Sequence, residues 1–163
     1  MRTTRTFASA GKRWAIVAGA LASCGLATGA TEASRAAEGA TEANKRVVLA
    51  FYEAGLNRKD YAGASRFLGE RYLQHNPTAD DGREGFAKFV RFLRANYPDA
   101  RSTVRQTFAD GDFVILHVLE RLHPSDRGNA IVDIFRLEQG KIVEHWDVKQ
   151  PIPDQAANGN GMF

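Results

Sequence analysis

Residues 130–148, Ala-Ile-Val-Asp-Ile-Phe-Arg-Leu-Glu-Gln-Gly-Lys-Ile-Val-Glu-His-Trp-Asp-Val, decide the fold because they predict a β-hairpin. Both arms are rich in β-branched and aromatic residues, and Gln139-Gly140 has the composition of a tight turn. Carboxylates and a histidine interrupt these apolar runs. Such groups are costly in a plain core but useful in a reaction pocket, so the hairpin is also the first place to look for function.

A two-residue turn at Gln139-Gly140 predicts which hairpin residues share a face. Val132 is then opposite Asp147, Ile134 is opposite His145 and Asp133 is opposite Trp146. This register places Asp147 and His145 on one face of the sheet and Asp133 on the other, unless a β-bulge shifts the pairing. On the far face, Asp133 is expected to pair with an arginine at a sheet or dimer surface.

The basic character of the chain comes from its first thirty residues. The whole sequence has a pI of about 9.2 and a net charge of +3, but residues 1–30 contain four bases and no acid. Without them, 18 of the 22 basic residues remain against 19 acidic ones, a net charge near −1. The remainder therefore lacks the basic surface that nucleic-acid binding requires, and no nucleic-acid partner is expected.

Residues 1–30 have the three parts of a secretory signal peptide, with a positive start, an apolar stretch from Trp14 to about Leu21, and small residues after it. Two ends compete. Leu21-Ala22-Ser23-Cys24 resembles a bacterial lipobox, which would lipidate Cys24, whereas Thr28-Gly29-Ala30 resembles an ordinary cleavage site. We expect export to the periplasm or the medium, with membrane contact only through such an anchor. Cys24 is the only cysteine, so the folded part has no disulfide.

Residues 31–41 show no apolar periodicity and predict a flexible tether, which leaves 42–163 as one domain. Helical spacing predicts helices over 41–56, from Asp60 to about 68, and over 83–97, with a short extended piece at 71–77 between the last two. After Pro98 the apolar residues recur with the two-residue period of strands, which predicts strands over 102–109 and 112–122 and the two arms of the hairpin. Helices followed by antiparallel strands indicate an α+β fold whose sheet wraps around a helical layer.

The candidate chemical groups outside the hairpin are histidines. His117 is the single titratable residue in an apolar strand, and His75 lies at the end of the short extended piece, two residues before Pro77. No closely spaced histidine pair exists, so no metal site is expected. A serine elbow, a glycine-rich phosphate loop and, in the folded domain, a thiol nucleophile are also missing from the sequence.

Three stretches resemble the SnoaL-like branch of the nuclear-transport-factor-two-like fold, a group that includes polyketide cyclases. They are Tyr72-Leu73-Gln74-His75-Asn76-Pro77 before Gly82-Arg83-Glu84, then Asp126-Arg127-Gly128 with residues 132–136, and then residues 140–148 with the tail 158–163. The resemblance covers nearly all of residues 43–163. It implies a cone-shaped half-barrel, with three N-terminal helices packed in the concave face of a strongly bent antiparallel sheet.

The resemblance also implies roles for residues. In related enzymes, including epoxide hydrolases of this fold, an aspartate on the strand after the Gly-Lys-Ile turn acts as acid or base, which points to Asp147. His117 and His75 match positions where such relatives place further polar groups, although His117-Val118-Leu119 lacks their second histidine. Candidate substrate contacts are Phe51, Tyr52, His145 and Trp146.

Two classes of function follow from this fold. The first is cofactor-free acid/base chemistry of the aldol or isomerisation type, in which Asp147 removes a proton next to the carbonyl of a small hydrophobic compound and a histidine stabilises the enolate. No cofactor is expected for it. The second is a non-catalytic module that binds a small molecule or forms a homodimer through the outer face of its sheet.

Overall fold

The structure, a computed structural model, describes residues 25–163, with side chains from Thr31 onward. Residues 1–24, with most of the predicted signal peptide and Cys24, lie outside the described part. Along the chain the elements are α1 (Gly25–Tyr52), a π-helical turn η1 (Glu53–Asn57), α2 (Tyr61–Ser65), β1 (Leu68–Gln74), α3 (Gly82–Asn96), β2 (Arg101–Asp110), β3 (Phe113–Arg121), β4 (Asn129–Glu138) and β5 (Lys141–Pro151).

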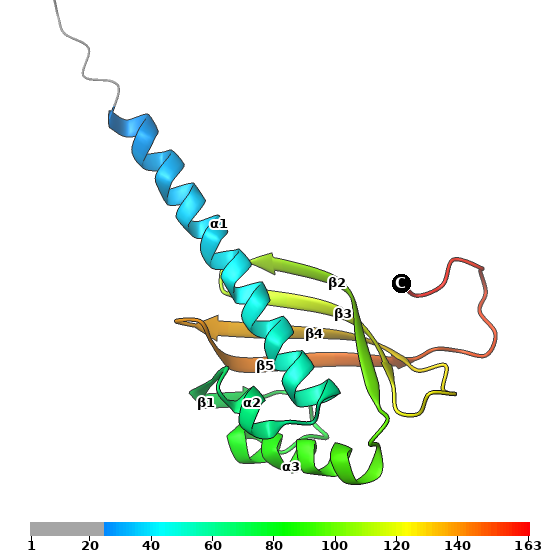
Figure 1. The fold of residues 1–163 in the computed structure, drawn as a ribbon. Coiled ribbons are helices and arrows are strands. Elements are labelled where there is room, and N and C mark those ends of the chain that lie inside the picture. The colour runs from blue at the N-terminus through cyan, green and yellow to red at the C-terminus, as the bar shows by residue number, and fades with distance from the viewer. Residues whose placement is uncertain (1–24) are drawn as a thin grey trace, which may run out of the picture.

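The five strands form one sheet in the order β1-β5-β4-β3-β2. The predicted α+β class is confirmed, with three α-helices before the β2–β5 meander and all of them on one side of the sheet (Figure 1). The sheet differs from the prediction in being mixed, because β1 runs parallel to β5 and aligns Gln74 with His145. This pairing brings the short strand before α3 beside the strand that carries Asp147.

Helix α1 is much longer than the predicted helix over 41–56. It includes residues 31–41, the predicted tether, which extend away from the body and of which 31–40 are exposed (Figure 1). From Asn44 onward the helix packs, and Val48, Phe51 and Tyr52 are buried in the core. The amphipathic part therefore lies where its apolar spacing predicts it, and the exposed part has no apolar face to bury.

The β4–β5 hairpin has the predicted turn but a different register. Gln139 and Gly140 both have positive φ, as a type I′ turn requires, and Glu138 pairs with Lys141. Pairing then shifts by one residue at a bulge beside Val143, so that Asp133 is opposite Asp147. The prediction that Asp133 faces away from Asp147 is wrong, because one bulged residue moves every later side chain of β5 to the other face.

The inner face of the sheet packs against the helices. Alternate residues of β4, namely Ile131, Asp133, Phe135 and Leu137, are buried there. Helix α3 approaches the turn η1 closely at Gly55, since a Cβ at that position would lie 2.7 Å from the ring of Phe86. The inner face and α3 together surround the space described next.

Candidate active site

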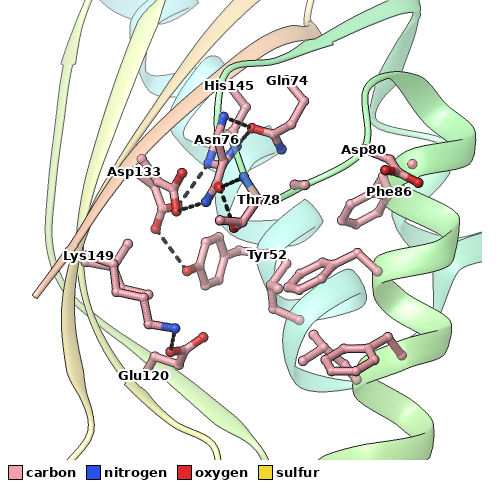
Figure 2. Close-up of a pocket in the computed structure, with 18 of the residues that line it drawn as sticks. Tyr52, Gln74, Asn76, Thr78, Asp80, Phe86, Glu120, Asp133, His145 and Lys149 are labelled. Atoms are coloured by element: carbon pink, nitrogen blue, oxygen red, sulfur yellow. Dashed lines mark hydrogen bonds and ion pairs between the residues drawn. The ribbon is translucent and has the colours of Figure 1, made fainter. Parts of the chain in front are cut away.

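A cavity of about 310 Å³ lies between the inner face of the sheet and helices α1 and α3. Its volume is near the lower end of the range of about 300–1,000 Å³ typical of small-molecule sites. Most of its wall is aromatic or aliphatic, supplied mainly by α1, α3 and β4: Phe51, Phe86, Phe89, Phe92, Leu93 and Phe135. The polar groups come from β1, the loop after it and the inner face of the sheet (Figure 2).

Asp147 is the one carboxylate of this cavity with an unused, buried oxygen. Its Oδ2 accepts a hydrogen bond from Asn76 Nδ2 at 2.9 Å, whereas its Oδ1 is buried and has no hydrogen-bond partner among the described residues. A buried polar atom without a partner is uncommon and marks a place where a ligand or a reacting group can bind. The predicted position of Asp147 in an internal pocket agrees with the structure.

Asp133 pairs with Asp147 on the neighbouring strand, and both of its carboxyl oxygens have hydrogen-bond partners. Its Oδ2 accepts from the Tyr52 hydroxyl at 3.0 Å, and its Oδ1 lies 3.0 Å from His145 Nε2 (Figure 2). Burial, followed by the nearby charge of Asp133, raises the pKa of Tyr52 well above its usual value. Tyr52 therefore keeps its proton and acts as a permanent donor to this carboxylate.

Gln74 determines which ring nitrogen of His145 carries a hydrogen. The amide oxygen of Gln74 accepts the backbone N–H of Asn76 at 2.9 Å, and His145 Nδ1 lies 3.1 Å from the same oxygen. Nδ1 therefore carries a proton and donates it to Gln74. Its other ring nitrogen, Nε2, lies 3.0 Å from Asp133 Oδ1, so the imidazole bridges Gln74 and Asp133.

Tyr72 contributes a hydroxyl near both aspartates. It is buried on β1, and burial, followed by the charges of Asp133 and Asp147, raises its pKa. Its oxygen accepts a long hydrogen bond of 3.4 Å from Gln74 Nε2, and the described residues offer its own proton no acceptor. Tyr72 is thus a protonated donor that is free to bind an oxygen atom in the cavity.

A charged pair lies further along the inner face. Lys149, two residues after Asp147 on β5, forms an ion pair with Glu120 of β3 (Figure 2). Glu120 also accepts from Asn129 Nδ2 at 3.0 Å. Asp80 is paired with Lys88 and Asp133 with His145, so Asp147 is the one carboxyl of the lining without an ion-pair partner among the described residues.

Three predicted site residues lie on the opposite face of the sheet. His117 contacts Gln106 and the ring of Phe163, and neither it nor His75 lines the cavity. His75 is bound to Glu144 at 2.8 Å and stacks on Trp146 with 4.6 Å between ring centroids. The expected grouping of Asp147 with a histidine at 117 or 75 is therefore corrected, as is the expectation that Trp146 forms a cavity wall.

The structure confirms other expectations of position and adds new residues. Phe51, Tyr52 and His145 line the cavity together with Asp147, as predicted. Tyr72, Gln74 and Asn76 were missed, although strand alternation indicates them. Along the piece 71–77, residues 72, 74 and 76 share a face that excludes His75. Within residues 25–163 no cluster of metal-ligating side chains occurs, and no helix there is long and apolar enough to cross a membrane.

A family model for the SnoaL-like domain matches residues 48–145, which is more than half of the chain. The chain belongs to the SnoaL-like domain family. The match begins in the packed part of α1 and ends at His145, so it includes most of the cavity wall. No curated protein sequence matches the chain significantly.

Solved structures agree with this family assignment. A Kribbella flavida protein assigned as a ketosteroid isomerase is 19% identical, with a TM-score of 0.59 over 72% of this chain and 85% of that one. A Bacillus cereus protein assigned as a polyketide cyclase is 19% identical, with a TM-score of 0.57 over 66% and 74%. An NTF2-like protein of unknown function from Cytophaga hutchinsonii is 21% identical, with a TM-score of 0.56 over 66% and 90%. This SnoaL-like domain thus has a fold shared by proteins assigned as isomerases and cyclases.

Proposed function

We propose that this SnoaL-like domain is a cofactor-independent acid/base catalyst that forms an enolate from a small, mainly apolar carbonyl compound. The observation that supports it is the buried Oδ1 of Asp147, which has no hydrogen-bond partner within residues 25–163 and lies in an aromatic-walled cavity. In this step Oδ1 takes a proton from the carbon next to the carbonyl, and the electron pair of the broken C–H bond moves into the enolate. An aldol addition or an isomerisation can follow from that intermediate.

The enolate oxygen needs a hydrogen-bond donor that is already in place. Tyr72 supplies it in this proposal, in the role that the sequence assigned to His117 or His75. Its raised pKa keeps the proton on the hydroxyl, and that proton has no acceptor in the described residues. Asn76 positions Asp147 through its 2.9 Å hydrogen bond and leaves Oδ1 free. Tyr52 and His145 each bind one oxygen of Asp133, so this neighbouring carboxyl is fully occupied within its own network.

The test uses 1-tetralone, a bicyclic ketone suited to a small aromatic cavity. Exchange of its α-hydrogens in deuterium oxide, followed by NMR, detects enolate formation whatever reaction comes next. Asp147→Asn keeps the shape but removes the base, so enzyme-dependent exchange should fall by about a hundredfold or more. Tyr72→Phe should lower it as well, and the exposed Asp110→Asn serves as the matched control. Exchange that is unchanged in Asp147→Asn would refute the mechanism.

A binding measurement distinguishes catalysis from simple ligand binding. 1-Naphthol has the ring skeleton of 1-tetralone and the hydroxyl of its enol. Binding of 1-naphthol without any exchange of 1-tetralone by the wild-type protein would favour the non-catalytic module. If the proposal holds, Tyr72→Phe weakens 1-naphthol binding because the variant loses the donor to its oxygen.

An interaction role is the second candidate, and the outer face of the sheet favours it. Phe108, Ile115, Ile134 and Trp146 are in register across four strands and form an apolar row on that face. Phe108 is 54% exposed, and Val148 nearby is 69% exposed. Such a row is a candidate protein contact, and we propose a homodimer through it. Sedimentation of the purified protein tests this, since a monomer at micromolar concentration would contradict it.

Export remains a proposal drawn from the sequence. All four bases of residues 1–30 precede or border the apolar stretch, and the first acid of the chain is Glu32. Intact-mass measurement of protein from its native cells should show loss of the residues before Cys24 or before Thr31. A diacylglyceryl group on Cys24 would identify the lipoprotein form, whereas a mature N-terminus at Met1 would refute export.

A further inference from the structure

The outer face of the sheet carries a second concavity, separate from the cavity of Asp147. It has a volume of about 710 Å³ and lies between β2, β3 and the segment 152–163, which turns back past the strand ends toward β2 (Figure 1). Arg105, Arg121 and Arg127 line it, and the single acid in its lining is Asp154. The side chains of its lining therefore carry a net charge of about +2, in a protein whose folded part is close to neutral.

Two features of strands β2 and β3 near this concavity are unfavourable or irregular. Arg101 lies directly opposite Arg121 on the neighbouring strand, a placement of like charges that is unfavourable in a sheet. Arg105 is the extra residue of a bulge between Val104 and Gln106, and bulges often redirect a side chain. We name Arg105, Arg121 and Arg127, the arginines that line the concavity, the outer arginine site.

Several N–H groups of the outer arginine site have no hydrogen-bond acceptor in the described part of the protein. Arg127 holds the tail through Asp154 at 2.8 Å, and Arg121 uses only Nε, toward the backbone oxygen of Asp126. Within residues 25–163, Arg105 makes no hydrogen bond or ion pair with a protein acceptor. Anchoring of the tail therefore accounts for Arg127 and leaves the Arg105 guanidinium and the Nη groups of Arg121 without a protein acceptor.

The concavity also has apolar surface next to these charges. Arg105 lies over the ring of Phe163, with 5.6 Å from its guanidinium carbon to the ring centroid. Leu119, Ile152 and Met162 line the same space. Free guanidinium groups prefer carboxylate or phosphate oxygens, and the neighbouring side chains prefer an apolar body.

We propose that the outer arginine site binds an amphipathic anion, namely an acidic headgroup attached to an aliphatic chain. The headgroup binds between Arg105 and Arg121, where the Arg105 guanidinium and the Arg121 Nη groups have no protein acceptor. The chain lies along Leu119, Met162 and Phe163. This site is independent of the chemistry proposed for Asp147, because the two concavities lie on opposite faces of the sheet.

Isothermal titration with octyl phosphate, below its micelle concentration, tests the site on the full-length protein. Octyl glucoside has the same chain without the charge, and inorganic phosphate has the charge without the chain. Arg105→Gln with Arg121→Gln should weaken octyl phosphate binding by about tenfold or more for each arginine removed. Arg58→Gln with Arg91→Gln removes the same charge from an exposed, distant surface and should leave binding unchanged.

Further measurements separate the sources of such an anion. Cosedimentation with phosphatidylglycerol vesicles, but not with phosphatidylcholine vesicles, and its loss in the Arg105/Arg121 double variant would identify a membrane headgroup as the ligand. Octyl phosphate binding without vesicle binding would identify a free amphiphile. The proposal is overturned if the double variant binds octyl phosphate and anionic vesicles as the wild type does, or if octyl glucoside or inorganic phosphate binds as tightly as octyl phosphate.

Discussion

The hydrogen bond between Tyr52 and Asp133 should contribute measurably to stability. Both residues are 5% exposed, and the hydroxyl donates to Oδ2 at 3.0 Å. Tyr52→Phe removes that donor and leaves a buried carboxylate oxygen without a partner. An unsatisfied buried acceptor of this kind costs about 2 kcal/mol, and more if it is charged. For a domain of this size that loss lowers the melting temperature by about 8 °C.

Urea unfolding followed by far-UV circular dichroism measures this loss. Tyr61→Phe is the matched control, because the Tyr61 hydroxyl makes no hydrogen bond within the described residues, and its cost should stay below about 0.5 kcal/mol. Asp133→Asn completes a double-mutant cycle with Tyr52→Phe, and the coupling should exceed about 1 kcal/mol. Additive effects in this cycle, or equal costs for Tyr52→Phe and Tyr61→Phe, would show that Asp133 does not face Tyr52.

Three further outcomes follow from the sheet and its turns. His75, followed by Arg136, holds the pKa of Glu144 below its usual range, so Glu144→Gln should cost up to about 1 kcal/mol at neutral pH. The lowered pKa means that the fold stabilises the ionised carboxylate. Protonation of Glu144 below about pH 4 should therefore remove the difference in stability between wild type and variant, which unfolding curves at several pH values would show. Ile134→Glu places a charge in the middle of the outer apolar row and should convert a dimer into monomers in sedimentation, whereas a dimer that persists would exclude that face. Gly128→Ala should destabilise the fold by more than about 1 kcal/mol in thermal unfolding, because Gly128 has φ of +97° and a Cβ would lie 2.3 Å from a backbone oxygen, while Gly39→Ala in open helix should be neutral or slightly stabilising.

Much of the local structure could be predicted because it depends on nearby residues. The spacing of Phe86, Val90 and Leu93 predicted α3 to within a residue at each end, and Asp60 caps α2 by accepting from the backbone N–H of Gly63. The turn at Gln139-Gly140 also has the predicted form. In each case a few consecutive side chains determine the backbone, so the amino-acid pattern was sufficient.

The composition of the site depended on the tertiary structure. A single extra residue, Val143, shifts the β4–β5 register, and nothing in the hairpin sequence marks where such a bulge occurs. That shift puts Asp133 opposite Asp147 on the inner face, where Tyr52 and His145 occupy both oxygens of Asp133.

The parallel pairing of β1 with β5 decided which residues of β1 and of the loop after it reach the cavity. It brings Tyr72, Gln74 and Asn76 beside residues about seventy positions later, and the same alternation turns His75 to the outer face. The sequence by itself determined which elements form and that Asp147 follows the turn on an apolar strand. Which polar groups meet in the cavity was decided by strand pairing, because contacts between distant segments depend on register, and a change of one residue reverses the face of every side chain.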